Sequence, residues 1–231
     1  MYFRDKVAYE PLPLPDRVRL PDAEALAAAE AFRDYMARRH SVRDFAPDPV
    51  PLSVIEACVA AAGTAPSGAN HQPWHFVAIG DPAMKAQIRA AAEAEEADFY
   101  AGGAGDEWLK ALEPIGTGVT KPHLEVAPWL VAIFAQRYGT TRDGQRYKNY
   151  YVPESVGIAT GFLIAALHHA GLTALTHTPN PMKFLNALCG RPDSEKPVMI
   201  LAVGHPAADA TVPAVAKLKK PLAEILTVRA G

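Results

Sequence analysis

Features that mark several common protein classes are absent from this sequence of 231 residues. It has only two cysteines, Cys58 and Cys189, and no CxxC pair, so neither a disulfide framework nor a zinc site is indicated. We interpret both as buried thiols in a reducing compartment. No run of about 18 apolar residues occurs, and the N-terminal residues lack the apolar core of a signal peptide. We therefore expect a cytoplasmic protein that does not enter a membrane.

Charge of one sign is also scarce. A net charge of −2 and a pI near 6.4 leave no broad cationic field, so we expect no nucleic-acid partner. The GxGxxG, GxxxxGK[ST], GxSxG and HExxH motifs are missing, so the common nucleotide, serine-hydrolase and zinc-protease sites are not supported. His71 and His75 are four residues apart, but Pro73 between them argues against a helix that would pair them on a metal. We expect no metal.

What is present is the pattern of one globular domain spanning residues 1–231, with mixed helices and strands. Apolar runs predict strands at 74–80, 129–136, 172–178 and 197–204. Helical spacing predicts helices at 22–39, 52–63, 82–100, 154–171 and 180–188. Asp22 and Asp81 are the expected N-caps of the first and third helices, and Pro82 suits the first helical position after Asp81.

Two segments stand apart from this pattern. Five of the 16 glycines fall between Gly102 and Gly118, which indicates a segment able to change shape. The tail, residues 206–231, ends in an apolar stretch that we expect to dock on another subunit.

A basic cluster follows the first predicted helix, in the stretch RRHSVRDF. Arg39, Ser41 and Arg43 could converge on one phosphate through charge-assisted hydrogen bonds. A basic helix end that interacts with its own dipole is the ordinary alternative.

Two further motifs are polar turns beside predicted strands. The stretch APSGANHQPW, residues 65–74, has prolines that restrict the backbone and a glycine, Gly68, that permits a close approach, so it suits a planar polar ring or is a structural loop. The stretch LTHTPN, residues 175–180, delivers the hydroxyl of Thr178 to the end of a strand, where threonine is common in any case.

The three motifs occur in this order in the nitroreductase superfamily of FMN-dependent enzymes, which this sequence resembles along nearly its whole length. The resemblance implies an α+β fold with a central, mostly antiparallel sheet flanked by helices, and an intertwined homodimer with FMN at its interface. Thr178 is implied to donate to flavin N5 and to tune the flavin, which makes it the one catalytic residue. The implied cofactor-binding residues are Arg39, His40, Ser41, Val42, Arg43, Ser67, Gly68, Thr176, His177, Thr178 and Lys219.

A fourth pattern resembles the iodotyrosine deiodinase branch of that superfamily, in its soluble bacterial form. Glu96 and Tyr100 are four residues apart, and Lys121 follows the glycine-rich stretch, as in the substrate lid of that branch; we expect a mobile lid over residues 93–121. The resemblance implies reductive dehalogenation of a halogenated tyrosine or related phenol. Glu96 would accept from its α-ammonium, Tyr100 and Lys121 would donate to its α-carboxylate, and the Ala69 N–H would meet its phenolate.

Other functions stay open at this point. Asn70 is closer to the general pattern of an NAD(P)H-dependent nitroreductase or quinone reductase. The flavin-fragmenting enzyme of cobalamin lower-ligand synthesis shares the fold, and a protein that binds a flavin or a tyrosine derivative without turnover is a further alternative. The reductant, either NAD(P)H or a flavin or ferredoxin reductase, is also left open.

Overall fold

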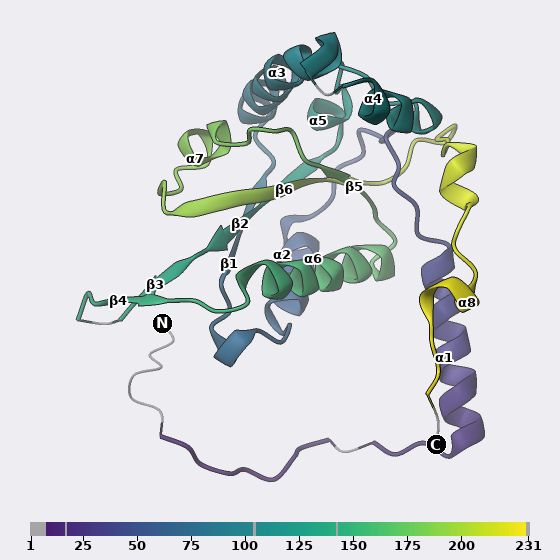
Figure 1. The fold of residues 1–231 in the computed structure, drawn as a ribbon, viewed down its shortest axis with the longest axis vertical. Coiled ribbons are helices and arrows are strands. Elements are labelled where there is room, and N and C mark those ends of the chain that lie inside the picture. Colours follow the sequence, from purple (N-terminus) through teal and green to yellow (C-terminus); the bar gives the residue numbers. More distant parts are fainter. Residues whose placement is uncertain (1–7, 17, 104, 142, 230–231) are drawn as a thin grey trace.

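The computed structural model describes residues 8–16, 18–103, 105–141 and 143–229 (Figure 1). Its centre is a sheet with the strand order β1 (Trp74–Ile79), β2 (Trp129–Gln136), β6 (Glu195–Gly204) and β5 (Thr173–His177). Each pair of neighbours is antiparallel, which agrees with the mostly antiparallel sheet that the family resemblance implied. The helices are α1 (Asp22–Ala37), α2 (Leu52–Gly63), α3 (Pro82–Asp98), α4 (Asp106–Leu112), α5 (His123–Val126), α6 (Val152–His169), α7 (Phe184–Leu188) and α8 (Leu222–Ile225).

Helices cover both faces of the sheet, because successive side chains of its central strands alternate between two apolar cores. On one face Val131 and Leu201 pack with Ile55 of α2 and Leu163 of α6. On the other face Phe134 of β2 belongs to the core that contains Ile88 of α3, Leu124 of α5 and Leu185 of α7. Figure 1 shows α3, α5 and α7 above the sheet and α2 and α6 below it. The sheet therefore lies between the turn after α2 and the lid segment at the end of α3.

The predicted helix starts are partly confirmed. The Asp81 carboxylate accepts from the N–H groups of Ala83 and Met84, as an N-cap should. Asp22 is not an N-cap: it is the first residue of α1, and the cap position is held by Pro21, which has no side-chain acceptor. The short helix expected from residue 180 begins only at Phe184, because the residues before it form bends and a turn in place of a first helical turn.

Not every strand matches the expectation either. β1 is a half-buried edge strand where a buried one was expected, since it has a neighbour on one side only. A small ribbon of β3 (Tyr138–Thr140) and β4 (Arg146–Lys148) was missed. The stacked contacts of this ribbon, such as the Arg146 guanidinium 3.5 Å from the centre of the Tyr138 ring, are not visible in a pattern of apolar residues.

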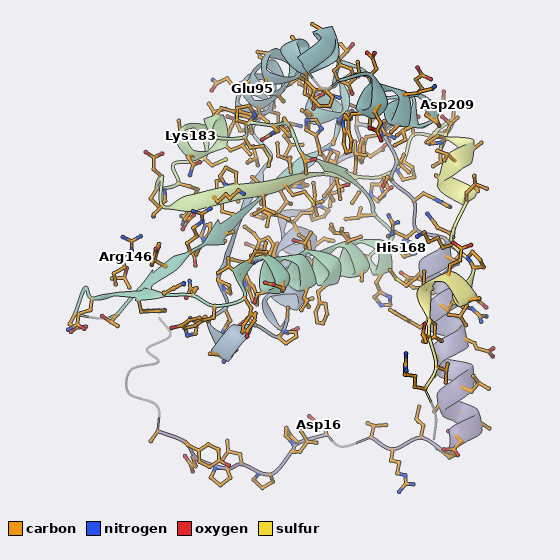
Figure 2. All side chains as sticks on the ribbon, viewed as in Figure 1. Asp16, Glu95, Arg146, His168, Lys183 and Asp209 are labelled. Carbon is orange, nitrogen blue, oxygen red and sulfur yellow. The ribbon has the colours of Figure 1, made fainter. Side chains whose placement is uncertain are left out.

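The two ends of the chain leave apolar surface uncovered. α1 has no buried residue, and Leu26 and Phe32 on it are each 62% exposed. Leu218 of the C-terminal segment is 75% exposed, and the later apolar residues of that segment are also exposed. Figure 2 shows most of α1 standing apart from the packed layers, and its end contacts α6, where the centres of the Tyr35 and His168 rings are 4.5 Å apart. Among the helices of the described residues, none combines the length and the apolar character needed to cross a membrane.

Candidate active site

A cavity of about 330 Å³ lies between the end of α3, the following turn and the end of β5. Glu96, Tyr100 and Lys121, the three predicted substrate-binding residues, all line it. So do Thr178 and Arg43, which were predicted as flavin ligands. The fold thus brings together residues from three separate motifs, and we call this space the clamp cavity.

The floor of the clamp cavity carries a buried ion pair. The Lys121 Nζ lies 2.6 Å from Glu96 Oε2, and the two side chains are 4% and 12% exposed. Lys121 also donates to the carbonyl of Gly118 at 2.6 Å and to the hydroxyl of Thr117 at 3.3 Å. Its ammonium lies 5.3 Å from the centre of the Tyr100 ring, within range of a cation–π contact. The cation and the anion expected to bind a ligand therefore neutralise each other here.

The two ends of the predicted lid are tied together at its base. The Lys121 N–H donates to Glu93 Oε1 at 2.6 Å, and Arg89 Nε donates to the same oxygen at 2.7 Å. Burial raises the pKa of Glu93, but these hydrogen bonds outweigh it and hold that pKa below its usual value. Glu93 was missed as a contact in the sequence, although Arg89 four residues before it was a visible partner.

The lid itself is largely helical. The helix expected to reach Tyr100 ends at Asp98 and continues as a π-helical turn, Phe99–Gly103, followed by α4 and a short 3-10 helix, Glu113–Ile115. Gly105 and Gly116 have φ angles of +75° and +67°, which favour glycine. Whether the lid moves stays a prediction.

The predicted phosphate motif runs along the free edge of β5. Ser41 forms a parallel β-bridge with Ala174, which places the residues after it level with the end of that strand. Thr176 and Thr178 are exposed on one face of the strand end, while His177 between them is buried on the other. Among the described residues, neither threonine hydroxyl has a hydrogen-bond partner.

Positive charge gathers around His40. Lys217 Nζ lies 3.1 Å from His40 Nε2. Burial and then the charges of Lys217, Arg39 and Lys219 lower the pKa of His40 below its usual value. Lys219 was predicted here, whereas Lys217, which makes the direct contact, was missed because both lie in one lysine-rich run. Val42, by contrast, is buried.

The turn after α2 is held in an unusual shape. Ala69 and Asn70 have φ angles of 50° and 54°, and the Ser67 hydroxyl accepts from the Gln72 N–H at 2.8 Å. A Cβ on Gly68 would lie 2.5 Å from the carbonyl oxygen of Tyr150, so only glycine fits. The Ala69 N–H has no acceptor among the described residues. The turn thus presents a free donor, as its predicted role requires.

This turn is not brought to the clamp cavity within one protomer. It follows α2, whereas Glu96 lies in the last turn of α3, and the sheet lies between the two helix layers. Ser67, Gly68 and Ala69 accordingly do not line the clamp cavity among the described residues. One copy of the chain therefore does not bring the two groups into a single site, and the expected homodimer stays a prediction.

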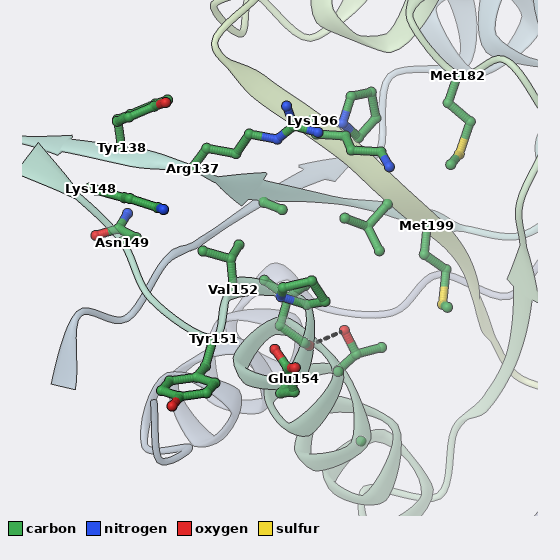
Figure 3. Close-up of a pocket in the computed structure, with 18 of the residues that line it drawn as sticks. Arg137, Tyr138, Lys148, Asn149, Tyr151, Val152, Glu154, Met182, Lys196 and Met199 are labelled. Carbon is green, nitrogen blue, oxygen red and sulfur yellow. Dashed lines mark hydrogen bonds between the residues drawn. The ribbon is translucent and has the colours of Figure 1, made fainter. Parts of the chain in front are cut away.

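A second cavity, of about 920 Å³, lies beside α6 (Figure 3). It extends from Tyr151, which packs on Gly68, to Asn180, which follows the Thr178 motif. Its wall is formed by α6, with Gly157 and Gly161, and by residues such as Met199 of β6. Among the described residues, none of the predicted site residues lines this cavity, although Asn180 lines both it and the clamp cavity.

Comparison with known proteins gives a consistent result. The model of the Nitroreductase family matches residues 36–205. The iodotyrosine deiodinase of Haliscomenobacter hydrossis is 51% identical over 190 residues, which cover 82% of this chain and 86% of that protein. Iodotyrosine deiodinase 1 of Homo sapiens is 41% identical over 207 residues, covering 89% of this chain and 71% of that protein.

Solved structures agree. Oxidized iodotyrosine deiodinase bound to FMN and 3-iodo-L-tyrosine has a TM-score of 0.71 and 30% identity, over 86% of this chain and 98% of that chain. The nitroreductase NfnB of Mycobacterium smegmatis, in complex with NADPH, has a TM-score of 0.66 at 22% identity, over 88% of this chain and 100% of that chain, and shows the fold alone. The chain therefore belongs to the nitroreductase family and, within it, to the iodotyrosine deiodinase branch.

Proposed function

We propose that the protein is an FMN-dependent oxidoreductase that reductively dehalogenates halotyrosines. The observation that carries this proposal is the buried pair of Glu96 and Lys121 beside Tyr100, in a cavity that Thr178 also lines. An amino-acid zwitterion has the two charges needed to replace each partner of that pair. The ligand in the solved relative, 3-iodo-L-tyrosine, is such a zwitterion.

In this proposal, the protein binds both charged groups of the ligand. Glu96 accepts from its α-ammonium, and Lys121 and the Tyr100 hydroxyl donate to its α-carboxylate. Because these side chains are largely buried, water is excluded and each contact gains strength. The aromatic ring of the ligand then points toward the end of β5, where Thr178 lies.

The residues present fit FMN. Its phosphate suits the cations around His40, with Arg39, Ser41 and Lys219 as ligands and Lys217 added to them. Thr176 and Thr178 have free hydroxyls for the flavin ring, and the free N–H of Ala69 suits a phenolate. When bound and reduced, FMN supplies two electrons, which with one proton replace the carbon–halogen bond by a carbon–hydrogen bond and release halide.

A homodimer is part of the proposal, since one protomer holds only half of these groups. In a two-fold symmetric pair, each subunit offers the same surface to the other. Contact across the large cavity beside α6 brings the turn with Gly68 of one subunit toward Thr178 of its partner. The C-terminal segment, residues 206–231, covers the partner, which accounts for its exposed apolar side chains.

The alternative, a general nitroreductase, has less support, because the nitroreductases among the solved structures, such as NfnB at 22% identity, share only the fold. The physiological reductant is not assigned. A cytoplasmic location is proposed on the strength of the two free thiols, Cys58 and Cys189.

Binding to the FMN-loaded protein tests the proposal. Titration with 3-iodo-L-tyrosine should change the flavin absorption spectrum at micromolar concentrations, and a nitroaromatic compound should not. A spectrum that responds only to the nitroaromatic would favour the nitroreductase instead.

A further inference from the structure

His177 is a buried imidazole whose role is not explained by the contacts above. Its side chain is on the opposite face of the strand end from Thr176 and Thr178, and it is 7% exposed. Its Nε2 has no hydrogen-bond partner among the described residues. Buried polar atoms are nearly always paired, so an unpaired one that faces a binding site calls for a functional reason.

The carboxylate of Glu96 lies close to this nitrogen. His177 Nε2 lies 3.6 Å from Glu96 Oε1, while Glu96 Oε2 is the oxygen paired with Lys121. The two oxygens of Glu96 therefore face different partners. A movement of roughly 0.6 Å would bring His177 within hydrogen-bond distance.

The imidazole is neutral near pH 7. Burial first, and then the charges of Lys121 and neighbouring groups, lower the pKa of His177 to about 3. His123, whose ring centre lies 5.7 Å away at an interplanar angle of 78°, packs edge-on against it and has its pKa lowered to about 4. A neutral imidazole has one N–H to donate, and this packing restricts how the ring can turn.

Ligand binding changes which hydrogen-bond donors the Glu96 carboxylate requires. When Lys121 turns to the ligand carboxylate, Oε2 of Glu96 is left to accept from the ammonium. Oε1 still requires a donor in a site that excludes water. His177, in the tautomer with its proton on Nε2, is the unpaired donor on that side.

We propose that His177 is a positioning residue of the substrate clamp. It donates from Nε2 to Glu96 Oε1 and so keeps Oε2 directed at the ammonium of the ligand. This inference rests on the proposed function, because it assigns the residue that aligns one pole of that clamp. His177 thus has a different role from Thr176 and Thr178, whose side chains lie on the opposite face of the strand end.

Two substitutions test the role. His177→Gln keeps an N–H near the position of Nε2, and His177→Met keeps a similar length without the donor. For dehalogenation of 3-iodo-L-tyrosine, we expect His177→Met to raise KM about tenfold with kcat within about twofold, as for loss of binding that is uniform along the reaction. His177→Gln should restore KM to within about threefold of the unchanged protein.

A second ligand and a matched control complete the experiment. The des-amino analogue, 3-(4-hydroxy-3-iodophenyl)propionate, has no ammonium, so its Kd should be the same in all three proteins. His75→Met, at a half-buried histidine of β1 near Arg191 and Glu195, should leave both ligands unaffected.

Equal effects of the two His177 substitutions would overturn the proposal, as would an equal loss of affinity for both ligands. The FMN content of each variant is measured in parallel, and a loss of bound FMN in His177→Met alone would also overturn it, because it would place the side chain in the cofactor site. If the unchanged protein neither binds nor dehalogenates iodotyrosine, the proposed function itself fails, which is a distinct result.

Discussion

Replacing one partner of the Lys121–Glu96 pair by an uncharged residue should open the lid of the protein without substrate. The side chains are 4% and 12% exposed, so the partner left behind is a nearly buried charge. Breaking such a pair costs about 3–5 kcal/mol, and a cost of about 3 kcal/mol raises the open fraction more than 100-fold. The lid should open before the whole protein unfolds, because opening of the lid exposes the unpaired charge to water.

The two single substitutions should differ. After Glu96→Gln, Lys121 keeps its hydrogen bonds to the Gly118 carbonyl and the Thr117 hydroxyl. After Lys121→Met, the one partner left to the Glu96 carboxylate among the described residues is His177, whose Nε2 lies 3.6 Å from Oε1. The Lys121→Met lid should therefore be the more open of the two. The double variant has no buried charge and should close again.

Trypsin cleavage after Lys110, which is exposed on α4 of the lid, measures the opening in FMN-loaded protein without ligand. We expect fast cleavage in Lys121→Met, intermediate cleavage in Glu96→Gln and near-native protection in the double variant. Iodotyrosine should protect only the unchanged protein, because the double variant has lost two contacts worth about 10- to 100-fold each. Unchanged cleavage in both single variants, or tight iodotyrosine binding by the double variant, would refute this reasoning.

Three further predictions follow from the same geometry. The phosphate dianion should raise the lowered pKa of His40, so FMN binding should take up a proton and should tighten as the pH falls toward the lowered pKa of the FMN-free protein. Isothermal titration in two buffers should show this proton uptake for the native protein and not for His40→Ala. His123 and His177 have folded pKa values of about 4 and 3, below the unfolded value of 6.5, so the unfolded chain binds more protons at acid pH. The free energy of unfolding should therefore fall as the pH drops from 6.5 toward 4, by about 3 kcal/mol for each histidine. In urea unfolding, a variant with both histidines replaced should lose less stability over this pH range. Gly68→Ala should destabilise the fold by about 1–3 kcal/mol and weaken FMN binding, because its Cβ meets a backbone carbonyl, whereas Gly63→Ala, with open space at the end of a helix, should be neutral or stabilising in thermal unfolding.

Much of the layered core could be predicted from the sequence. The apolar runs that became β2 and β6 are buried along nearly their whole length, so their pattern had one interpretation. The Asp81–Pro82 start of α3 was equally clear, because cap and proline act within a single turn. The three residues predicted from their spacing to bind the substrate, Glu96, Tyr100 and Lys121, do line one cavity, and their binding role stays a prediction.

Other parts depend on contacts between distant residues. His123 and His177 are separated in sequence by the second strand and α6, and nothing local shows that their rings pack together. Lys217 could not be distinguished from Lys219 within one lysine-rich run. The apolar spacing of α1 correctly predicted a helix, but not that its apolar side chains would be exposed in the protomer.

The most direct test of the account is a single anaerobic turnover. The FMN-loaded protein is reduced chemically, mixed with 3-iodo-L-tyrosine, and assayed for iodide and tyrosine. The account predicts about one iodide and one tyrosine for each reduced FMN, as two-electron reduction requires. Oxidised flavin without iodide, or reduced flavin that persists beside intact iodotyrosine, would contradict it.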